Sequence, residues 1–154
     1  MRLAFGSDHA GYELKERLKK AVSEAGHDII DFGTDSPESV DYPDYAAAVG
    51  RAVAAGEAEL GILVCGTGLG MEIAANKIPG VRAASCSNLF EAAMARRHND
   101  ANVLCLGSRI LAPEYAEAIV RIFLEERFEG GRHQKRIDKI ARLEGQERKG
   151  REPA

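Results

Sequence analysis

The sequence lacks the features that mark membrane, secreted and multidomain proteins. Its 154 residues contain no apolar run close to the ~18 residues that a membrane-spanning helix needs. An acidic residue, Asp8, follows only seven residues after the start, which argues against a secretory signal. There is no internal repeat or linker that would separate two domains. With 45% hydrophobic and 29% charged residues, the sequence predicts one globular domain that does not contact a membrane.

Cysteine is scarce, and its spacing excludes two common uses. The three cysteines, Cys65, Cys86 and Cys105, are odd in number and show no C-x-x-C spacing. A disulfide framework or a paired-cysteine metal site is therefore not predicted. Without a secretory signal, this pattern is typical of reduced thiols, so we expect a cytoplasmic protein.

Only one end of the chain carries a net positive charge. The net charge is −3 overall, yet residues 127–154 carry nine Lys/Arg and five Asp/Glu, and residues 1–126 carry 12 and 19. No aromatic residues alternate with the basic ones, and the whole protein is acidic. The sequence therefore does not predict nucleic-acid binding, and a solvated basic segment is the simplest interpretation of the excess.

Apolar runs with strand character alternate with segments of helical spacing along the chain. Such alternation predicts an α/β fold with a mostly parallel, doubly wound sheet, for which we expect the strand order 2-1-3-4-5. In that order the ligand site lies between strands one and three, outside their carboxyl ends. The domain is expected to cover residues 1–144 and a flexible tail residues 145–154. The expected strands are 2–6, 27–33, 59–65, 81–85 and 103–107, and the expected helices are 12–25, 45–55, 71–77, 89–97, 113–126 and 133–143.

Two polar loops fall where this topology expects a ligand. Strand one is followed by Ser7-Asp8-His9-Ala10-Gly11, and strand three by Cys65-Gly66-Thr67-Gly68-Leu69-Gly70. The glycine loop lacks the Lys-Ser/Thr ending of a P-loop and the G-x-G-x-x-G spacing of a dinucleotide site. Its backbone N–H groups suit an anion or a developing oxyanion instead. Cysteine at such a position is favoured as the reactive thiolate, which makes Cys65 a candidate for chemistry.

Four further side chains are candidates with two interpretations each. His98 near a helix end either satisfies the helix dipole or acts in catalysis. Arg132 and Arg136 are four residues apart and therefore share one helix face. They either bind a phosphate dianion together or belong to a solvated helix. Glu72, just past the glycine loop, is a rival base or a partner of the helix dipole.

Six motifs together resemble the ribose-5-phosphate isomerase B family, which includes relatives of the galactose-6-phosphate isomerase subunits. The resemblance extends from about residue 2 to residue 144. It implies a Rossmann-like three-layer α/β/α sandwich, no metal or other cofactor, and a homodimer, sometimes a tetramer, whose active sites use both subunits. The motifs are Gly6-Ser7-Asp8-His9-Ala10-Gly11, Asp41-Tyr42-Pro43, Cys65-Gly66-Thr67-Gly68-Leu69-Gly70, Ala74-Ala75-Asn76-Lys77, Arg97-His98-Asn99-Asp100 and Gly130-Gly131-Arg132-His133.

The resemblance also implies roles for individual residues. Cys65 matches the family's proton-abstracting base, and His98 matches the group that assists ring opening. Some members use a glutamate beyond the glycine loop instead; here Met71 occupies that place and Glu72 is one position late, which favours Cys65. Arg132 and Arg136 match the phosphate-binding pair. The implied substrate contacts are Asp8, His9, Gly66, Thr67, Gly68, Leu69, Gly70, Asn99 and Arg109.

The function expected from these features is aldose–ketose isomerisation of a small sugar phosphate. D-ribose 5-phosphate and D-ribulose 5-phosphate would interconvert by proton transfer through a cis-enediolate. Three alternatives stay open: isomerisation of a hexose 6-phosphate or tetrose 4-phosphate, noncatalytic sugar-phosphate binding, and nucleic-acid binding by the basic segment.

Overall fold

The computed structural model describes residues 1–150 and contains one parallel sheet of five strands. All neighbouring strands pair in parallel, in the order β2-β1-β3-β5-β4. The strands are β1 (Arg2–Ser7), β2 (Asp28–Asp31), β3 (Leu60–Cys65), β4 (Ala83–Ser85) and β5 (Val103–Gly107).

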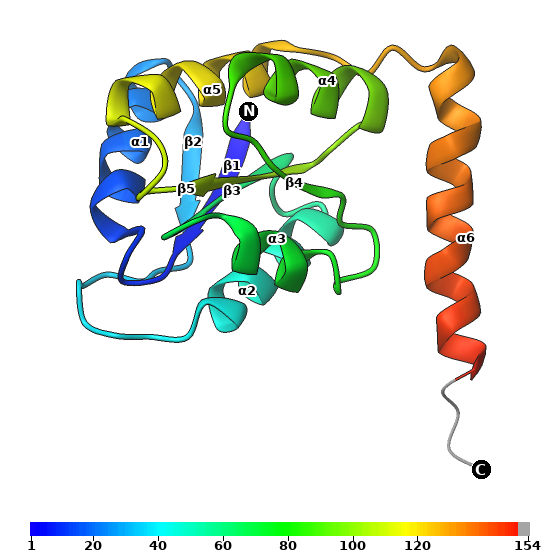
Figure 1. Cartoon of the computed structure of the whole chain (residues 1–154), viewed down its shortest axis with the longest axis horizontal. Helices are drawn as coiled ribbons and strands as arrows, with labels where there is room; N and C mark the ends of the chain where they lie inside the picture. The colour runs from blue at the N-terminus through cyan, green and yellow to red at the C-terminus, as the bar shows by residue number, and fades with distance from the viewer. Residues whose placement is uncertain (151–154) are drawn as a thin grey trace.

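Helices cover both faces of the sheet, as predicted for a three-layer sandwich (Figure 1). On one face lie α1, α4 and α5, and on the other α2 and α3; a 3-10 turn, η1, leads into α6, which stands at the side of the domain (Figure 1). The helices are α1 (Tyr12–Glu24), α2 (Tyr42–Ala54), α3 (Leu69–Ala75), α4 (Leu89–Asn99), α5 (Pro113–Glu125) and α6 (Gln134–Gly150), with η1 at Gly131–His133.

The period-two alternation of the strands divides the core into two clusters. On β3, Ile62 and Val64 pack against the α1 side, whereas Leu63 and Cys65 pack against α2 and α3. Every residue of β3 is buried, which is typical of a central parallel strand. Cys65 thus ends a rigid strand and belongs to the α2–α3 side of the core.

The predicted strand order 2-1-3-4-5 is wrong at one edge, where β5 and not β4 lies beside β3. All five residues of β5 are buried, with Leu104 in one core cluster and Cys105 in the other, so this strand needs cover on both faces. The three-residue β4 is half-buried throughout and tolerates the exposed edge. The predicted ligand position is unaffected, because β1 still lies between β2 and β3.

Several element boundaries differ from those expected. Helix α2 begins at Tyr42, three residues early, because Pro43 is acceptable in a first helical turn. Helix α6 extends to Gly150 rather than ending at residue 143. The flexible tail stays a prediction, and residues 151–154 lie outside the described part of the chain. Among the described helices, none is long and apolar enough to cross a membrane.

Candidate active site

The loops after β1, β3 and β5 are joined by hydrogen bonds at the carboxyl edge of the sheet. The backbone N–H of Asp8 donates to the carbonyl of Val64 at 3.2 Å, and that of Ser108 donates to the carbonyl of Cys65 at 2.9 Å. The hydroxyl of Ser108 donates to the carbonyl of Ala10 at 2.7 Å. Three loops that are distant in sequence thus form one framework around Cys65, at the predicted position.

The thiol of Cys65 is the centre of this framework. Its side chain is buried, with 5% exposed, and its Sγ accepts a hydrogen bond from the backbone N–H of Gly68 at 3.1 Å. Gly68 has a φ of 82°, a left-handed conformation that other residues adopt at a cost, and this bend turns its N–H back toward the sulfur. This hydrogen bond fixes the sulfur beside the backbone of the glycine loop.

Two side chains cover the glycine loop. A carbon added at Gly66 would lie 2.9 Å from Nη1 of Arg109, so the guanidinium lies against the loop backbone. A carbon added at Gly70 would lie 2.7 Å from the ring of Tyr42. The loop therefore has a cation on one side and a phenol on the other, and its glycines admit both.

Asp8 and His9 are held by the loops around them. The carboxylate of the buried Asp8 accepts the N–H of Gly11 at 3.0 Å, which closes the turn after β1. Nδ1 of His9 accepts the N–H of Val40 at 3.2 Å, which joins this turn to the segment before α2. Both predicted contact residues thus share the carboxyl edge with Cys65.

The other two cysteines differ from Cys65 in their surroundings. Burial raises the pKa of Cys86 to about 12, and the nearby carboxylates of Glu91 and Glu72 add to the effect. Burial also raises the pKa of Cys105 well above its usual range. Both remain protonated thiols at neutral pH and act as small apolar packing residues.

Glu72 is engaged in holding the end of the sheet. Its Oε1 accepts the backbone N–H of Ser85 at 3.0 Å, which joins α3 to the end of β4. This hydrogen bond gives Glu72 a structural role at the end of β4.

His98 and Asn99 lie at the other edge of the sheet. Both residues end α4, immediately before β5. The guanidinium of Arg82, beside the start of β4, donates to the carbonyls of Asn99 at 3.1 Å and Asp100 at 2.9 Å, which joins the end of α4 to the start of β4. The N–H of Gly61, near the start of β3, donates to the carbonyl of Asn102. This is the amino edge, one strand length from Cys65.

Arg132 and Arg136 lie on the same side of the molecule as His98. Both arginines are exposed, on η1 and the first turn of α6. The ring of His133, between them in sequence, stacks on that of His98 with centroids 4.2 Å apart. Burial lowers the pKa of His133, and the charges of His98 and Arg132 add to the effect, so its imidazole is neutral at pH 7. The predicted phosphate pair and the predicted ring-opening histidine therefore belong together.

The predicted residues form two half-sites rather than one. A strand of five or six residues spans roughly 15–20 Å, which is far beyond hydrogen-bond reach. Cys65, Asp8, His9, the glycine loop and Arg109 are brought together; His98, Asn99, Arg132 and Arg136 are grouped elsewhere. Within one chain the two groups do not meet.

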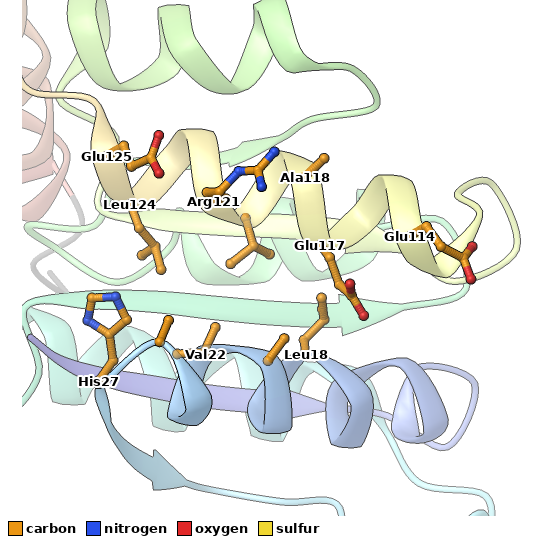
Figure 2. A pocket seen from close by; sticks show the side chains of 12 residues that line it. Leu18, Val22, His27, Glu114, Glu117, Ala118, Arg121, Leu124 and Glu125 are labelled. Atoms are coloured by element: carbon orange, nitrogen blue, oxygen red, sulfur yellow. The ribbon is translucent and has the colours of Figure 1, made fainter.

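A separate groove of about 480 Å³ lies between α1 and α5 and contains none of the predicted site residues. Figure 2 shows its apolar floor, from Leu18 and Val22 to Leu124, and the carboxylates along its rim. At one end of the groove, Nδ1 of His27 lies 3.4 Å from the terminal amine of Met1, and this contact gives His27 a structural role. This groove carries no arrangement of reactive groups.

Sequence reasoning missed three side chains that the structure places in these half-sites. Tyr42 covers Gly70, and Glu129 and His133 contact His98. Tyr42 and His133 stood within recognised motifs without an assigned role. Only the i, i+4 spacing of Glu129 and His133 could have signalled their pairing.

Comparisons with known proteins agree on one family. Residues 3–140 match the family described as Ribose/Galactose Isomerase. Ribose-5-phosphate isomerase B of Escherichia coli strain K12 is 49% identical over 143 residues, 93% of this chain and 96% of that protein. The structure of Clostridium thermocellum ribose-5-phosphate isomerase B matches with a TM-score of 0.95 and 49% identity, covering 96% of this chain and 99% of that one. A D-erythrulose-4-phosphate isomerase of Pectobacterium atrosepticum is 38% identical over 149 residues, 96% of this chain and 98% of that protein.

Proposed function

Because the chain belongs to the ribose/galactose isomerase family, we propose that it interconverts D-ribose 5-phosphate and D-ribulose 5-phosphate. The observation that carries the proposal is the N–H of Gly68 directed at Sγ of Cys65, in a glycine loop at the topological switch point. The three cysteines, which form no disulfide, fit the reducing cytoplasm as the site of the reaction.

Cys65 acts as the base in this mechanism. Its thiolate removes the proton from C2 of the open-chain aldose, and the electron pair forms the C1–C2 double bond of a cis-enediolate. The same thiol returns the proton to C1, while a proton moves from the oxygen on C2 to that on C1, which completes the ketose.

Backbone donors stabilise the enediolate oxygen. The N–H of Gly68 is committed to sulfur, and that of Leu69 donates to Oγ1 of Thr67 at 3.3 Å. The N–H of Gly70 lies in the first turn of α3, where backbone donors have no helical acceptor, so it is the best-placed donor of the loop. One such donor contributes about 3 kcal/mol to transition-state stabilisation.

A second copy of the chain completes each site. His98 must reach the ring oxygen of the furanose to assist its opening, yet it lies at the opposite edge of the sheet from Cys65 in its own chain. A homodimer that brings the amino edge of one chain to the carboxyl edge of its partner resolves this conflict. Arg132 and Arg136 then bind the phosphate and Asn99 contacts the sugar, which orients the reacting end through remote binding energy.

A second candidate is the isomerisation of a shorter or longer aldose phosphate. It is favoured by the name of the Pectobacterium atrosepticum relative, an isomerase of a four-carbon sugar phosphate. Measuring kcat/KM for tetrose 4-phosphate, pentose 5-phosphate and hexose 6-phosphate substrates separates the two. The five-carbon substrate should have the highest kcat/KM. A higher kcat/KM for a four- or six-carbon substrate would identify that sugar phosphate as the substrate instead.

Removal of the thiol tests the role of Cys65. Cys65→Ala should lose nearly all turnover, by roughly a hundredfold to ten-thousandfold, while still binding substrate. Cys86→Ala is the matched control, because it deletes an equally small buried thiol outside the loop, and it should keep turnover near that of the unaltered protein. Full activity in Cys65→Ala would refute the base assignment, and tight binding without turnover in the unaltered protein would indicate a noncatalytic sugar-phosphate-binding protein.

A further inference from the structure

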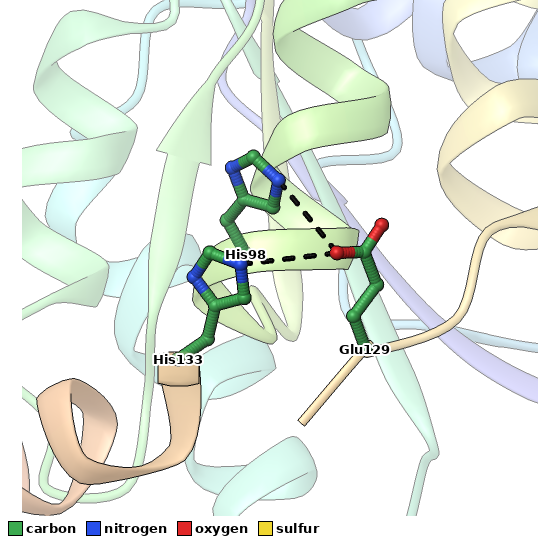
Figure 3. Close-up of side chains that lie close together, drawn as sticks. All are labelled: His98, Glu129 and His133. Atoms are coloured by element: carbon green, nitrogen blue, oxygen red, sulfur yellow. Dashed lines mark ion pairs between the residues drawn. The ribbon is translucent and has the colours of Figure 1, made fainter. Parts of the chain in front are cut away.

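Two imidazoles and a carboxylate converge at the amino edge of the sheet, from segments distant in sequence. Nε2 of His98 lies 3.9 Å from Oε2 of Glu129, and Nε2 of His133 lies 3.8 Å from the same oxygen. Figure 3 shows both rings facing this carboxylate. One donor atom from each residue lies within 4.8 Å of the other two, and no other group of this kind occurs among the residues whose side chains the structure describes.

One donor of this cluster is buried and unused. The side chain of His133 is 8% exposed, and its Nε2 has no hydrogen-bond partner in the described part of the chain. Its distance of 3.8 Å from Glu129 is too long for a hydrogen bond. Buried polar atoms are normally satisfied, and an ion between this nitrogen and the facing carboxylate would satisfy it.

The donor set selects a particular class of ligand. Imidazole nitrogen with carboxylate oxygen suits Zn²⁺ and similar first-row cations, whereas Mg²⁺ and Ca²⁺ prefer oxygen alone. Ligands about 2.1 Å from a tetrahedral zinc lie about 3.4 Å apart, so the two nitrogen–oxygen separations of 3.9 and 3.8 Å need to contract by roughly 0.4 Å. The two imidazole rings, now stacked with an interplanar angle of 13°, must also turn so that both Nε2 lone pairs point at the ion. The side chain of Glu129 is 50% exposed, so its carboxylate has room to approach the two rings.

We propose that His98, His133 and Glu129 bind one Zn²⁺ ion through two Nε2 atoms and a carboxylate oxygen, and that this ion inhibits the enzyme. Three protein ligands leave the fourth position to water. The bound ion takes the Nε2 lone pair of His98, which then has no basic nitrogen there to exchange a proton with the sugar ring. The inhibition rests on the proposed ring-opening role of His98, whereas the metal binding does not.

The test titrates the chelator-treated full-length protein with Co²⁺, which reports tetrahedral coordination by its visible absorption, and then displaces it with Zn²⁺. We expect one ion per chain, no thiolate-to-cobalt charge-transfer band, and no displacement by Mg²⁺. Glu129→Gln should weaken binding at least tenfold, and His133→Asn should do the same from a second ligand. Glu125→Gln, an equal change of charge at a nearby exposed position, should bind like the unaltered protein.

A parallel assay measures Zn²⁺ inhibition of isomerisation, each variant relative to its own metal-free rate. The concentration for half-inhibition should rise at least tenfold in Glu129→Gln and stay unchanged in Glu125→Gln. Absence of saturable Co²⁺ binding would overturn the proposal, as would a thiolate band or a site lost in Cys65→Ala and kept in Glu129→Gln. Co²⁺ binding at the cluster in a protein without isomerase activity would refute the proposed function and leave the metal site standing.

Discussion

The buried ammonium of Lys15 offers a test of what holds the predicted half-site at the end of β1. Its side chain on α1 is fully buried, and Nζ donates at 2.8 Å to both carboxylate oxygens of Asp31 and at 2.7 Å to the carbonyl of Thr34. The N–H of Thr34 in turn donates to the carbonyl of Ser7 at 2.9 Å, next to Asp8. Lys15 thus connects α1, β2 and the last residue of β1.

The loss of unfolding free energy on removing this ammonium depends on the partners that Asp31 keeps. Breaking a buried ion pair by deleting one partner costs about 3–5 kcal/mol. Asp31 is 27% exposed and keeps Lys19 at 2.6 Å, so we expect Lys15→Met to lower the free energy of unfolding by about 2–3 kcal/mol. Lys19→Met removes a partly exposed cation from the same carboxylate and should cost less than about 1 kcal/mol.

Urea unfolding at pH 7 measures both variants, and the melting temperature of Lys15→Met should fall by roughly 5–10 °C. Burial would raise the pKa of Asp31, but hydrogen bonds from Lys15 and Lys19 outweigh it and hold the pKa below its ordinary value of 3.8. The coupling free energy between Lys15→Met and Asp31→Asn, measured in a double-mutant cycle, should therefore be fully present above pH 3.8 and decrease as the pH falls further. Equal losses in Lys15→Met and Lys19→Met would refute this reasoning.

Two further predictions concern the glycine loop and the thiols. Gly68→Ala should lower stability by more than about 1–2 kcal/mol and reduce kcat, because its φ is 82° and the added carbon would lie 2.7 Å from Oγ of Ser85. Gly56 has a similar φ of 77° but no atom near the added carbon, so Gly56→Ala should lower stability through backbone strain and leave kcat unchanged. An equal kcat in both variants would show that the geometry of the glycine loop does not affect catalysis. Iodoacetamide at pH 8 should alkylate one thiol per chain, as measured by mass spectrometry, and should abolish turnover. Burial keeps Cys86 and Cys105 protonated and therefore unreactive. Alkylation of Cys86 or Cys105 before Cys65 would contradict this prediction.

The fold and half of the site follow from local patterns in the sequence. Apolar runs and glycines identify the strands, and topology alone places Asp8 and Cys65 at the switch point. The position of β5 between β3 and β4 was not predictable, because it depends on how completely each strand is buried in the assembled core.

The second half-site depends on packing between segments distant in sequence. The ends of α4 and η1 meet only in the folded chain, where His133 stacks on His98. No periodicity relates these two histidines. The distance of one strand length between His98 and Cys65 is the observation on which the proposed second subunit rests.

The most direct test of the shared active site mixes two inactive proteins, Cys65→Ala and His98→Asn. If each site takes Cys65 from one chain and His98 from the other, a mixed dimer contains one intact site and one doubly altered site. After subunit exchange of equal amounts, half of the dimers are mixed, so we expect about a quarter of the activity of the unaltered protein. A mixture no more active than the sum of its parents would contradict a site built from two chains.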